Sequence, residues 1–381
     1  MSHLKLPPLS LYVHIPWCIQ KCPYCDFNSH ALKHDIPEAI YVARLLDDLR
    51  ADLGWVQGRS LSSIFIGGGT PSLFSASSIK QLLDGISALI PLQPDCEITL
   101  EANPGTFETE RFSGFVDAGI TRLSIGVQSL QNEQLQALGR IHDPQQAIVA
   151  AEHASKLNLT SYNLDLMHGL PGQSLADAMA DLDGVIALNP PHISWYQLTI
   201  EPNTAFASRP PQLPEDDELW RIQEHGHDRL VAAGYQQYEV SAYAKIGHQS
   251  KHNRNYWMFG DYLGIGCGAH SKITLPAAGE IVRCEKIKHP QGYLDLTRAL
   301  RYKEWLVDAD ERPFEFFMNY FRLLEPVPKS SFEDLTGLSS SVADALLTDA
   351  IAKQLVIDQV DYWETTPLGR RFLNSVLDLL V

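Results

Sequence analysis

The sequence has little positive charge for its length. It holds 30 Lys and Arg against 46 Asp and Glu, which gives a formal net charge of −16 at pH 7. Nucleic-acid-binding proteins neutralise phosphates with clustered cations, so the whole-chain balance argues against that class of function. Hydrophobic residues make up 45% and charged residues 20% of the 381 residues, which fits a large globular domain with a smaller second one.

Long apolar runs are also missing. No stretch approaches the roughly 18 uninterrupted apolar residues that span a bilayer, so we expect no membrane span. The first eight residues, Met-Ser-His-Leu-Lys-Leu-Pro-Pro, contain no apolar core and no cleavage site, and we therefore expect no signal peptide. Thiols kept free for metal ligation fit a reducing compartment, which predicts a cytoplasmic location.

Cysteine is scarce but concentrated. Three of the six cysteines, Cys18, Cys22 and Cys25, form a C-x3-C-x2-C pattern directly after a short apolar run that ends at Pro16. Three thiols cannot pair off as disulfides without leaving one over, and a tetrahedral zinc site would want a fourth ligand close by. A 4Fe–4S cluster tolerates three protein thiolates when another ligand takes the fourth iron. The spacing therefore favours an iron–sulfur cluster.

Apolar periodicity predicts six strands that alternate with helices up to residue 200. We expect strands at 11–15, 63–66, 97–101, 122–127, 161–167 and 193–200, and helices at 40–53, 79–89, 107–118, 131–139, 144–157 and 174–188. Helical crossovers imply a parallel sheet, and the strands are expected to be apolar because both faces are covered. Polar residues follow the strands at their carboxyl ends, where sites form in such sheets.

The second half of the chain is less periodic. A Pro-rich acidic connector from Ser208 leads to a helix at 217–233 and a strand at 234–240, and the stretch 251–257 is expected to be a loop. Beyond residue 305, three helices, two short strands and a terminal helix at 370–380 are typical of a winged helix. This region has 13 acidic and 6 basic residues, a net charge of −7, so we expect a lid or partner surface and no DNA binding.

The cysteine loop resembles the signature of the radical S-adenosylmethionine (radical SAM) superfamily. Its flanking residues narrow the resemblance to the branch that contains oxygen-independent coproporphyrinogen III dehydrogenase and haem chaperones: Tyr12, His14, Pro16, Trp17, Pro23, Tyr24 and Phe27. The resemblance implies an α/β fold, an open three-quarter (β/α)6 radical SAM barrel with a small α+β winged-helix-like C-terminal domain. The implied divisions are a barrel at 1–235, a connecting region at 236–304 and the C-terminal domain at 305–381.

The same resemblance implies the cofactors. Cys18, Cys22 and Cys25 would hold a 4Fe–4S cluster whose open iron is chelated by SAM, with an electron donor such as flavodoxin and a 5′-deoxyadenosyl radical as the product of reduction. The SAM-contacting positions fall on Tyr12, Tyr24, Gly68, Gly69, Thr70, Glu101, Gln128, Arg140 and Asp165. Glu101 suits the ammonium of SAM, Arg140 its carboxylate, Asp165 the ribose hydroxyls and Tyr24 the adenine.

Two further motifs resemble sequences of the haem-chaperone branch. They are His-Asn-x-x-Tyr-Trp at 252–257 and Gly-x-Gly-x-Gly-Ala-His-Ser at 264–271, whose glycines would let a flat ligand or the SAM adenosine approach the backbone. Plausible axial ligands for haem iron are His252, Tyr256, Cys267 and His270, although each has an ordinary structural interpretation as well.

An enzymatic and a non-enzymatic interpretation of this branch compete. The dehydrogenase has an N-terminal extension before its cluster loop, whereas this chain has only 17 residues before Cys18. The dehydrogenase also has a fourth cysteine two residues after the third, whereas this chain has Phe27 at that position. We therefore expect a haem chaperone that delivers haem to acceptor proteins, with respiratory membrane proteins among the candidates. The alternative is oxygen-independent coproporphyrinogen III dehydrogenase, which decarboxylates propionates oxidatively in haem biosynthesis.

Overall fold

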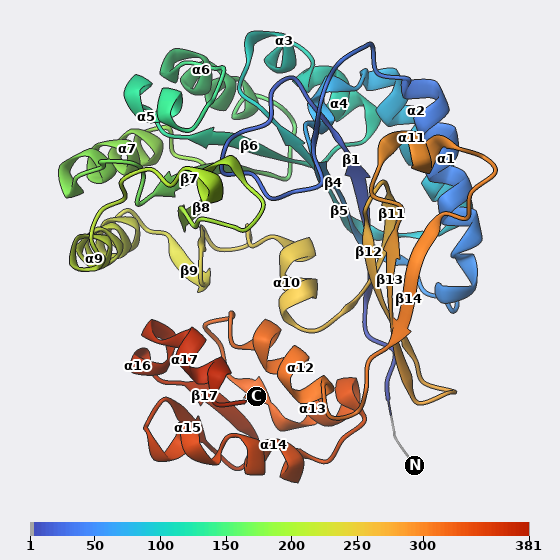
Figure 1. Ribbon diagram of the computed structural model, residues 1–381, viewed down its shortest axis with the longest axis vertical. Coiled ribbons are helices and arrows are strands. Elements are labelled where there is room, and N and C mark those ends of the chain that lie inside the picture. Colours follow the sequence, from blue (N-terminus) through green and yellow to red (C-terminus); the bar gives the residue numbers. More distant parts are fainter. Residues whose placement is uncertain (1–3, 381) are drawn as a thin grey trace.

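A curved sheet of twelve strands forms the body of the molecule (Figure 1). The computed structural model describes residues 4–380. Six parallel strands follow one another in chain order, as predicted: β1 (Leu9–Ile15), β4 (Leu61–Gly68), β5 (Leu92–Ala102), β6 (Arg122–Gln128), β7 (Ser161–His168) and β8 (His192–Gln197). They form the open three-quarter barrel. A seventh strand that the sequence did not predict, β11 (Asp261–Gly266), pairs parallel with β1.

Residues 236–304 extend this sheet at both edges. Beyond β11 lie the antiparallel strands β12 (His270–Leu275), β13 (Glu280–Lys286) and β14 (Arg301–Leu306). Beyond β8 lie β10 (Ala242–Ala244) and β9 (Gln236–Glu239). The short strands β2 (Trp17–Cys18) and β3 (His30–Ala31) pair across the cysteine loop and join its two ends. The connecting region thus continues the barrel sheet on both sides.

Helices cover the outer face of the sheet (Figure 1). They are α1 (Glu38–Ala51), α2 (Ala76–Leu89), α3 (Thr106–Thr109), α4 (Phe112–Ala118), α5 (Asn132–Ala137), α6 (Pro144–Ala154), α7 (Leu175–Ala187), α9 (Asp216–Ala232) and α11 (Pro290–Leu294). The short α8 (Ala205–Ser208) lies instead beside the cysteine loop, where the Phe206 amide donates to the Pro23 carbonyl. The prediction of a single helix at 107–118 is wrong, because this segment forms two short helices, α3 and α4, with a turn between them. Arg111 sits at this break and donates to the carbonyls of Leu73 and Phe74, which fixes the change of direction.

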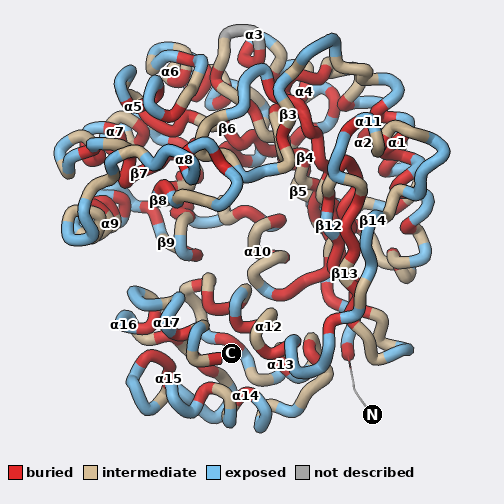
Figure 2. The backbone as a smooth tube through the Cα atoms, in the orientation of Figure 1, coloured by how far each residue is buried: buried red, intermediate tan, exposed pale blue. Residues whose placement is uncertain are grey.

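The barrel strands alternate between apolar and polar side chains. Residues such as Ile64, Ile66, Leu123 and Ile125 face the helices and are fully buried, and Figure 2 shows the sheet as the buried centre of this layer. The neighbouring positions, which face the lumen, are largely polar. The expectation of strands that are apolar on both faces was therefore wrong, since only the outer face is covered by helices.

The C-terminal region has its own core. Its elements are α12 (Arg312–Tyr320), β15 (Val327–Pro328), α13 (Lys329–Thr336), α14 (Ser340–Leu346), α15 (Thr348–Ala352), β16 (Val356–Asp358), β17 (Tyr362–Thr365), α16 (Pro367–Arg371) and α17 (Leu373–Asp378). The predicted two-stranded wing has a third strand, in the order β15-β17-β16, and the terminal helix is split at Phe372. Phe316, Phe317, Phe332 and Trp363 pack together at its centre.

A short helix, α10 (Lys251–Trp257), lies where a loop was expected, between the barrel and the C-terminal domain (Figure 1). Ser250 caps it by accepting a hydrogen bond from the Asn253 amide, and the Glu97 carboxylate accepts from the amides of Lys251 and His252. A carboxylate at a helix N-terminus stabilises the free amides and the helix dipole. Because Glu97 comes from β5, only the tertiary structure makes this helix possible. None of the helices described for residues 4–380 is long and apolar enough to cross a bilayer.

Candidate functional site

The cysteine loop lies at the carboxyl end of β1. The Gly69 and Thr70 amides donate to the carbonyls of Ile15 and Trp17 and so fix the start of the loop beside the end of β4. Burial raises the pKa of the Cys18 thiol, and the nearby Cys22 and Cys25 raise it further, whereas hydrogen bonds to Thr70 and Ser29 lower it. Cys22 and Cys25 therefore lie close enough to Cys18 to influence its ionisation.

The donor set fits an iron–sulfur cluster. Three thiols of one loop are accompanied by hydrogen-bonding groups, since Cys25 Sγ lies 3.5 Å from Ser29 Oγ and Arg140 Nη1 lies 3.7 Å from Cys22 Sγ. Such donors next to thiolates stabilise their negative charge. Over residues 4–380 no three Cys, His, Asp or Glu side chains are arranged around a common point as ligands of a single metal ion.

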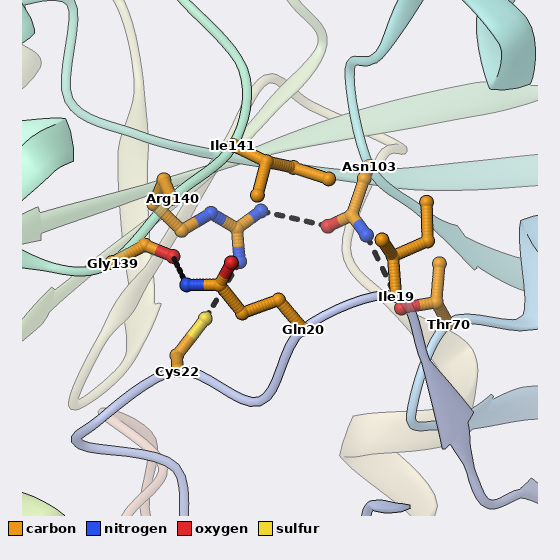
Figure 3. A pocket seen from close by; sticks show the side chains of 8 residues that line it. All are labelled: Ile19, Gln20, Cys22, Thr70, Asn103, Gly139, Arg140 and Ile141. Atoms are coloured by element: carbon orange, nitrogen blue, oxygen red, sulfur yellow. Dashed lines mark hydrogen bonds between the residues drawn. The ribbon is translucent and has the colours of Figure 1, made fainter. Parts of the chain in front are cut away.

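A small pocket opens beside Cys22 (Figure 3). Arg140 crosses it and donates to Asn103 Oδ1 at 2.7 Å and to the Gly126 carbonyl at 2.8 Å, while Asn103 Nδ2 donates to Thr70 Oγ1 at 3.2 Å. The guanidinium is thus held rigidly at the rim, where a carboxylate could bind it. Sequence reasoning missed Asn103, although its place just past the end of β5, two residues after Glu101, was a usable signal.

The glycine run Gly67–Gly69 is required by close packing. A Cβ at Gly68 would overlap the His14 imidazole, and Gly68 has a φ of +114°, which side chains other than hydrogen rarely tolerate. A Cβ at Gly69 would lie 2.5 Å from the Trp17 carbonyl oxygen. The Gly68 amide donates to Glu101 Oε2 at 3.0 Å, which connects this turn to the next strand.

Two acidic residues share the inner rim. Burial raises the pKa of Glu101 to about 7; the Gly68 amide opposes this rise and the charge of Asp165 adds to it. Burial also raises the pKa of Asp165, against hydrogen bonds from Asn163 at 2.8 Å and Ser124 at 3.2 Å. Two half-buried carboxyl groups with raised pKa values favour a cationic ligand, because a positive charge would stabilise both ionised forms.

His14 ties the cysteine loop to the barrel. Its Nε2 lies 2.9 Å from the Asn28 carbonyl oxygen and its Nδ1 lies 2.9 Å from Tyr12 Oη. A carbonyl oxygen can only accept, so Nε2 carries the proton and Nδ1 accepts from Tyr12. Burial lowers the pKa of His14 to about 4, and the imidazole is neutral at physiological pH.

The remaining predicted SAM positions join the same rim. Gln128 adopts a left-handed φ of +69° and accepts a 2.8 Å hydrogen bond from the Tyr196 hydroxyl. Strained backbone at a non-glycine residue is often found at functional sites. Tyr24 packs against Phe206, with 6.4 Å between the ring centroids. Sequence reasoning missed Tyr196, whose signal was its alternation with His192 and Ser194 along β8. Eight of the nine predicted SAM positions thus lie around one rim, and Tyr12, opposite Phe65 on the neighbouring strand, lies just beneath it.

The four haem candidates do not converge. His252 and Tyr256 lie together on α10, with 4.9 Å between their rings, and His252 is 1% exposed. Cys267 is buried, its Sγ donates to the Lys288 carbonyl at 2.6 Å, and burial raises its pKa to about 12, so the thiol is neutral. His270 is exposed, with Nε2 3.8 Å from Glu285 Oε1.

The glycines at 264, 266 and 268 serve packing within the chain. A Cβ at Gly264 would overlap the His270 carbonyl, one at Gly266 would lie 2.5 Å from the His14 carbonyl oxygen, and one at Gly268 would lie 2.5 Å from Asn28 Nδ2. The expectation that they leave room for a ligand was wrong, because the protein itself fills that room. They allow β11 to pack against β1 and the cysteine loop.

Comparisons with known proteins identify the family of this chain. Residues 12–183 match the Radical SAM superfamily and residues 307–372 match the HemN C-terminal domain. The chain is 58% identical over 378 residues to the heme chaperone HemW of Escherichia coli and 60% identical over 381 residues to that of Haemophilus influenzae, each covering 99% of both chains. The crystal structure of the E. coli coproporphyrinogen III oxidase HemN superimposes with a TM-score of 0.83 over 100% of this chain and 91% of that one, at 22% identity, and shows the same fold. The chain belongs to the HemW family of radical SAM proteins.

Proposed function

We propose that this protein is a haem chaperone that binds haem and passes it to acceptor proteins, with a 4Fe–4S cluster and SAM in its barrel. The observation that carries the proposal is the single rim on which the cysteine loop, the glycine turn and the half-buried Glu101–Asp165 pair meet, in a chain that is 58–60% identical to heme chaperones over its full length. A cytoplasmic location and an electron donor such as flavodoxin belong to the same proposal.

Each rim residue has a part in this proposal. Cys18, Cys22 and Cys25 would hold the cluster, and a bound cluster with SAM supplies one-electron reductive chemistry. Arg140 would bind the SAM carboxylate through a guanidinium that Asn103 already orients. Glu101 would accept from the ammonium, Asp165 from the ribose hydroxyls, and Tyr24 would lie against the adenine. Gly68, Gly69 and Thr70 keep the approach to the rim clear, while Tyr12 and Gln128 border it.

For the haem iron we propose His252 as ligand. Its Nδ1 lies 3.0 Å from Ser63 Oγ, and its Nε2 is buried without any hydrogen-bond partner among the described residues. Burial lowers the pKa of His252 to about 3, so the ring is neutral at physiological pH. When Nδ1 donates its proton to Ser63, the lone pair of Nε2 is free, and a neutral imidazole of this kind is a common iron ligand.

The other candidates are less suited. The Cys267 thiol is protonated and already donates to a carbonyl, and Tyr256 is a neighbour of His252 with a pKa well above its ordinary value because of burial. His270 is accessible, but it lies on β12 beside Glu285 and away from His252 and Tyr256 on α10. His252 is the one candidate whose ligating atom is buried and lacks another partner in the part of the chain that the structure describes.

The test is a haem titration of anaerobically reconstituted protein, followed by its Soret band. We expect His252→Ala to weaken haem binding at least tenfold, His270→Ala to change it little, and the surface control His225→Ala to bind like the wild type. Coproporphyrinogen turnover is measured on the same samples. Conversion at ordinary enzymatic rates, or haem binding that none of the variants affects, would overturn the proposal in favour of the dehydrogenase or of another haem site.

A further inference from the structure

A second layer of side chains lies in the barrel lumen beneath the rim. The strand register places Phe65 opposite Thr99 and Thr99 opposite Arg122. Thr99 precedes Glu101 by two residues on β5, which puts this layer about 7 Å deeper. His252 completes the layer by stacking on Phe65, with 5.0 Å between the ring centroids. The four side chains therefore meet inside the barrel.

Arg122 in this layer is a buried cation that no ion pair within residues 4–380 neutralises. It is 3% exposed, and its Nε has no hydrogen-bond acceptor among those residues. Thr99 Oγ1 and His252 Nε2 are likewise buried and unpartnered beside it. A buried guanidinium without a counter-ion strongly disfavours the folded state. Three unsatisfied polar groups in one layer therefore point to a polar ligand.

Two carboxylates on the strands that flank β6, Asp165 of β7 and Glu97 of β5, are already engaged. Asp165 accepts from Asn163 and Ser124, and although the charge of Arg122 helps to lower its pKa, the two form no ion pair. Glu97 accepts from the first amides of α10. Neither acidic residue forms an ion pair with the guanidinium, which leaves its N–H donors to an anion from outside the chain.

We propose that Arg122 binds a propionate carboxylate of the porphyrin inside the lumen. This inference rests on the proposed haem-binding function and names the group by which the ligand is held. Phe65, Tyr12 and Tyr256 line the same lumen and are only partly buried, so parts of these aromatic rings are accessible in the lumen that holds the cation. A planar macrocycle that carries carboxylates matches this combination of aromatic walls and one guanidinium.

The experiment compares haem with haem dimethyl ester, in which both propionates are uncharged. Soret titrations are performed with the wild type, Arg122→Gln, Arg122→Lys and Arg50→Gln, the last replacing an exposed arginine of α1 as the matched control. We expect the wild type and Arg50→Gln to bind haem about tenfold to hundredfold more tightly than the ester. Arg122→Gln should bind both ligands equally, and Arg122→Lys should keep part of the preference.

The outcomes separate this inference from the proposed function. Wild-type protein that binds no haem contradicts the chaperone function itself. Wild-type protein that binds haem and ester equally, or Arg122→Gln protein that still prefers haem, overturns the role of Arg122 and leaves the chaperone function intact. SAM binding to Arg122→Gln is measured in parallel, and its loss with an unchanged haem preference would assign the guanidinium to SAM and refute the inference. If Arg122→Gln does not fold, as judged by circular dichroism, the wild-type ester comparison and Arg122→Lys decide.

Discussion

Gly68→Ala is the substitution whose cost the structure defines best. Gly68 has a φ of +114°, and a methyl group there would collide with the imidazole of His14. That ring cannot move easily, because Tyr12 and the Asn28 carbonyl hold both of its nitrogens at 2.9 Å. The backbone conformation costs about 1–2 kcal/mol for alanine, and overpacking adds about 1–3 kcal/mol. We expect a loss of about 3 kcal/mol in the free energy of unfolding.

The matched control is Gly234→Ala. Gly234 has a φ of +88°, and no atom lies within 4 Å of the place that an alanine methyl group would occupy, so alanine there carries only the backbone cost. Urea titrations of the two variants should differ by about 2 kcal/mol. In the double variant Gly68→Ala/His14→Ala the collision is gone, and the two changes should couple by about 1 kcal/mol or more. Equal losses in both glycine variants, or strict additivity in the double variant, would refute the packing argument.

Three further predictions concern buried charge. Burial raises the pKa of Glu101 in the folded state to about 7, while in the unfolded chain this carboxyl group ionises at its ordinary pKa. The free energy of unfolding of the wild type should therefore fall by about 3 kcal/mol as the pH rises from 4.5 to 7. Urea titrations of Glu101→Gln over the same pH range should lack this loss. Arg122→Met removes an unpaired buried cation, so the free energy of unfolding of ligand-free protein, measured by urea titration, should stay equal or rise by about 1–3 kcal/mol. A fall in this free energy by the same amount would mean that Arg122 has a structural partner. Lys286→Met leaves Asp48 and Asp52 buried without the ammonium that lies 2.5 and 2.7 Å from them, and should lower the free energy of unfolding by about 3–5 kcal/mol. Thermal melts measure this loss, and the control Lys303→Met, which replaces an exposed lysine, should change stability little.

Much of the barrel followed from the sequence because its signals are local. Short apolar runs, with apolar residues at helical spacing between them, predicted six β/α units, and the family resemblance predicted the open barrel. The rim could be predicted as well, since parallel strands bring their carboxyl ends to one edge. Glu101, Asp165 and the glycine turn, 33 to 97 residues apart in sequence, meet there for this reason.

Other parts of the site were not predictable because they depend on partners from distant elements. Helix α10 has only seven residues, and its first amides bind Glu97, about 155 residues away. The glycines at 264, 266 and 268 suggested space for a ligand, but β11 lies against β1, and its glycines accommodate that contact. Asn103 and Tyr196 became visible as site residues only through their hydrogen bonds to Arg140 and Gln128.

The amino-acid sequence by itself determined the chemistry available to this protein: three thiols in one short loop, a glycine turn after a buried strand, and acidic residues at strand ends. These features are encoded within a few residues of one another, where backbone geometry leaves little choice. Only the tertiary structure decided which groups lack a partner, because hydrogen bonding and burial depend on neighbours from the whole chain. Thus His252 and Arg122, ordinary residues in the sequence, become unsatisfied groups of the lumen once β4, β5, β6 and α10 enclose them.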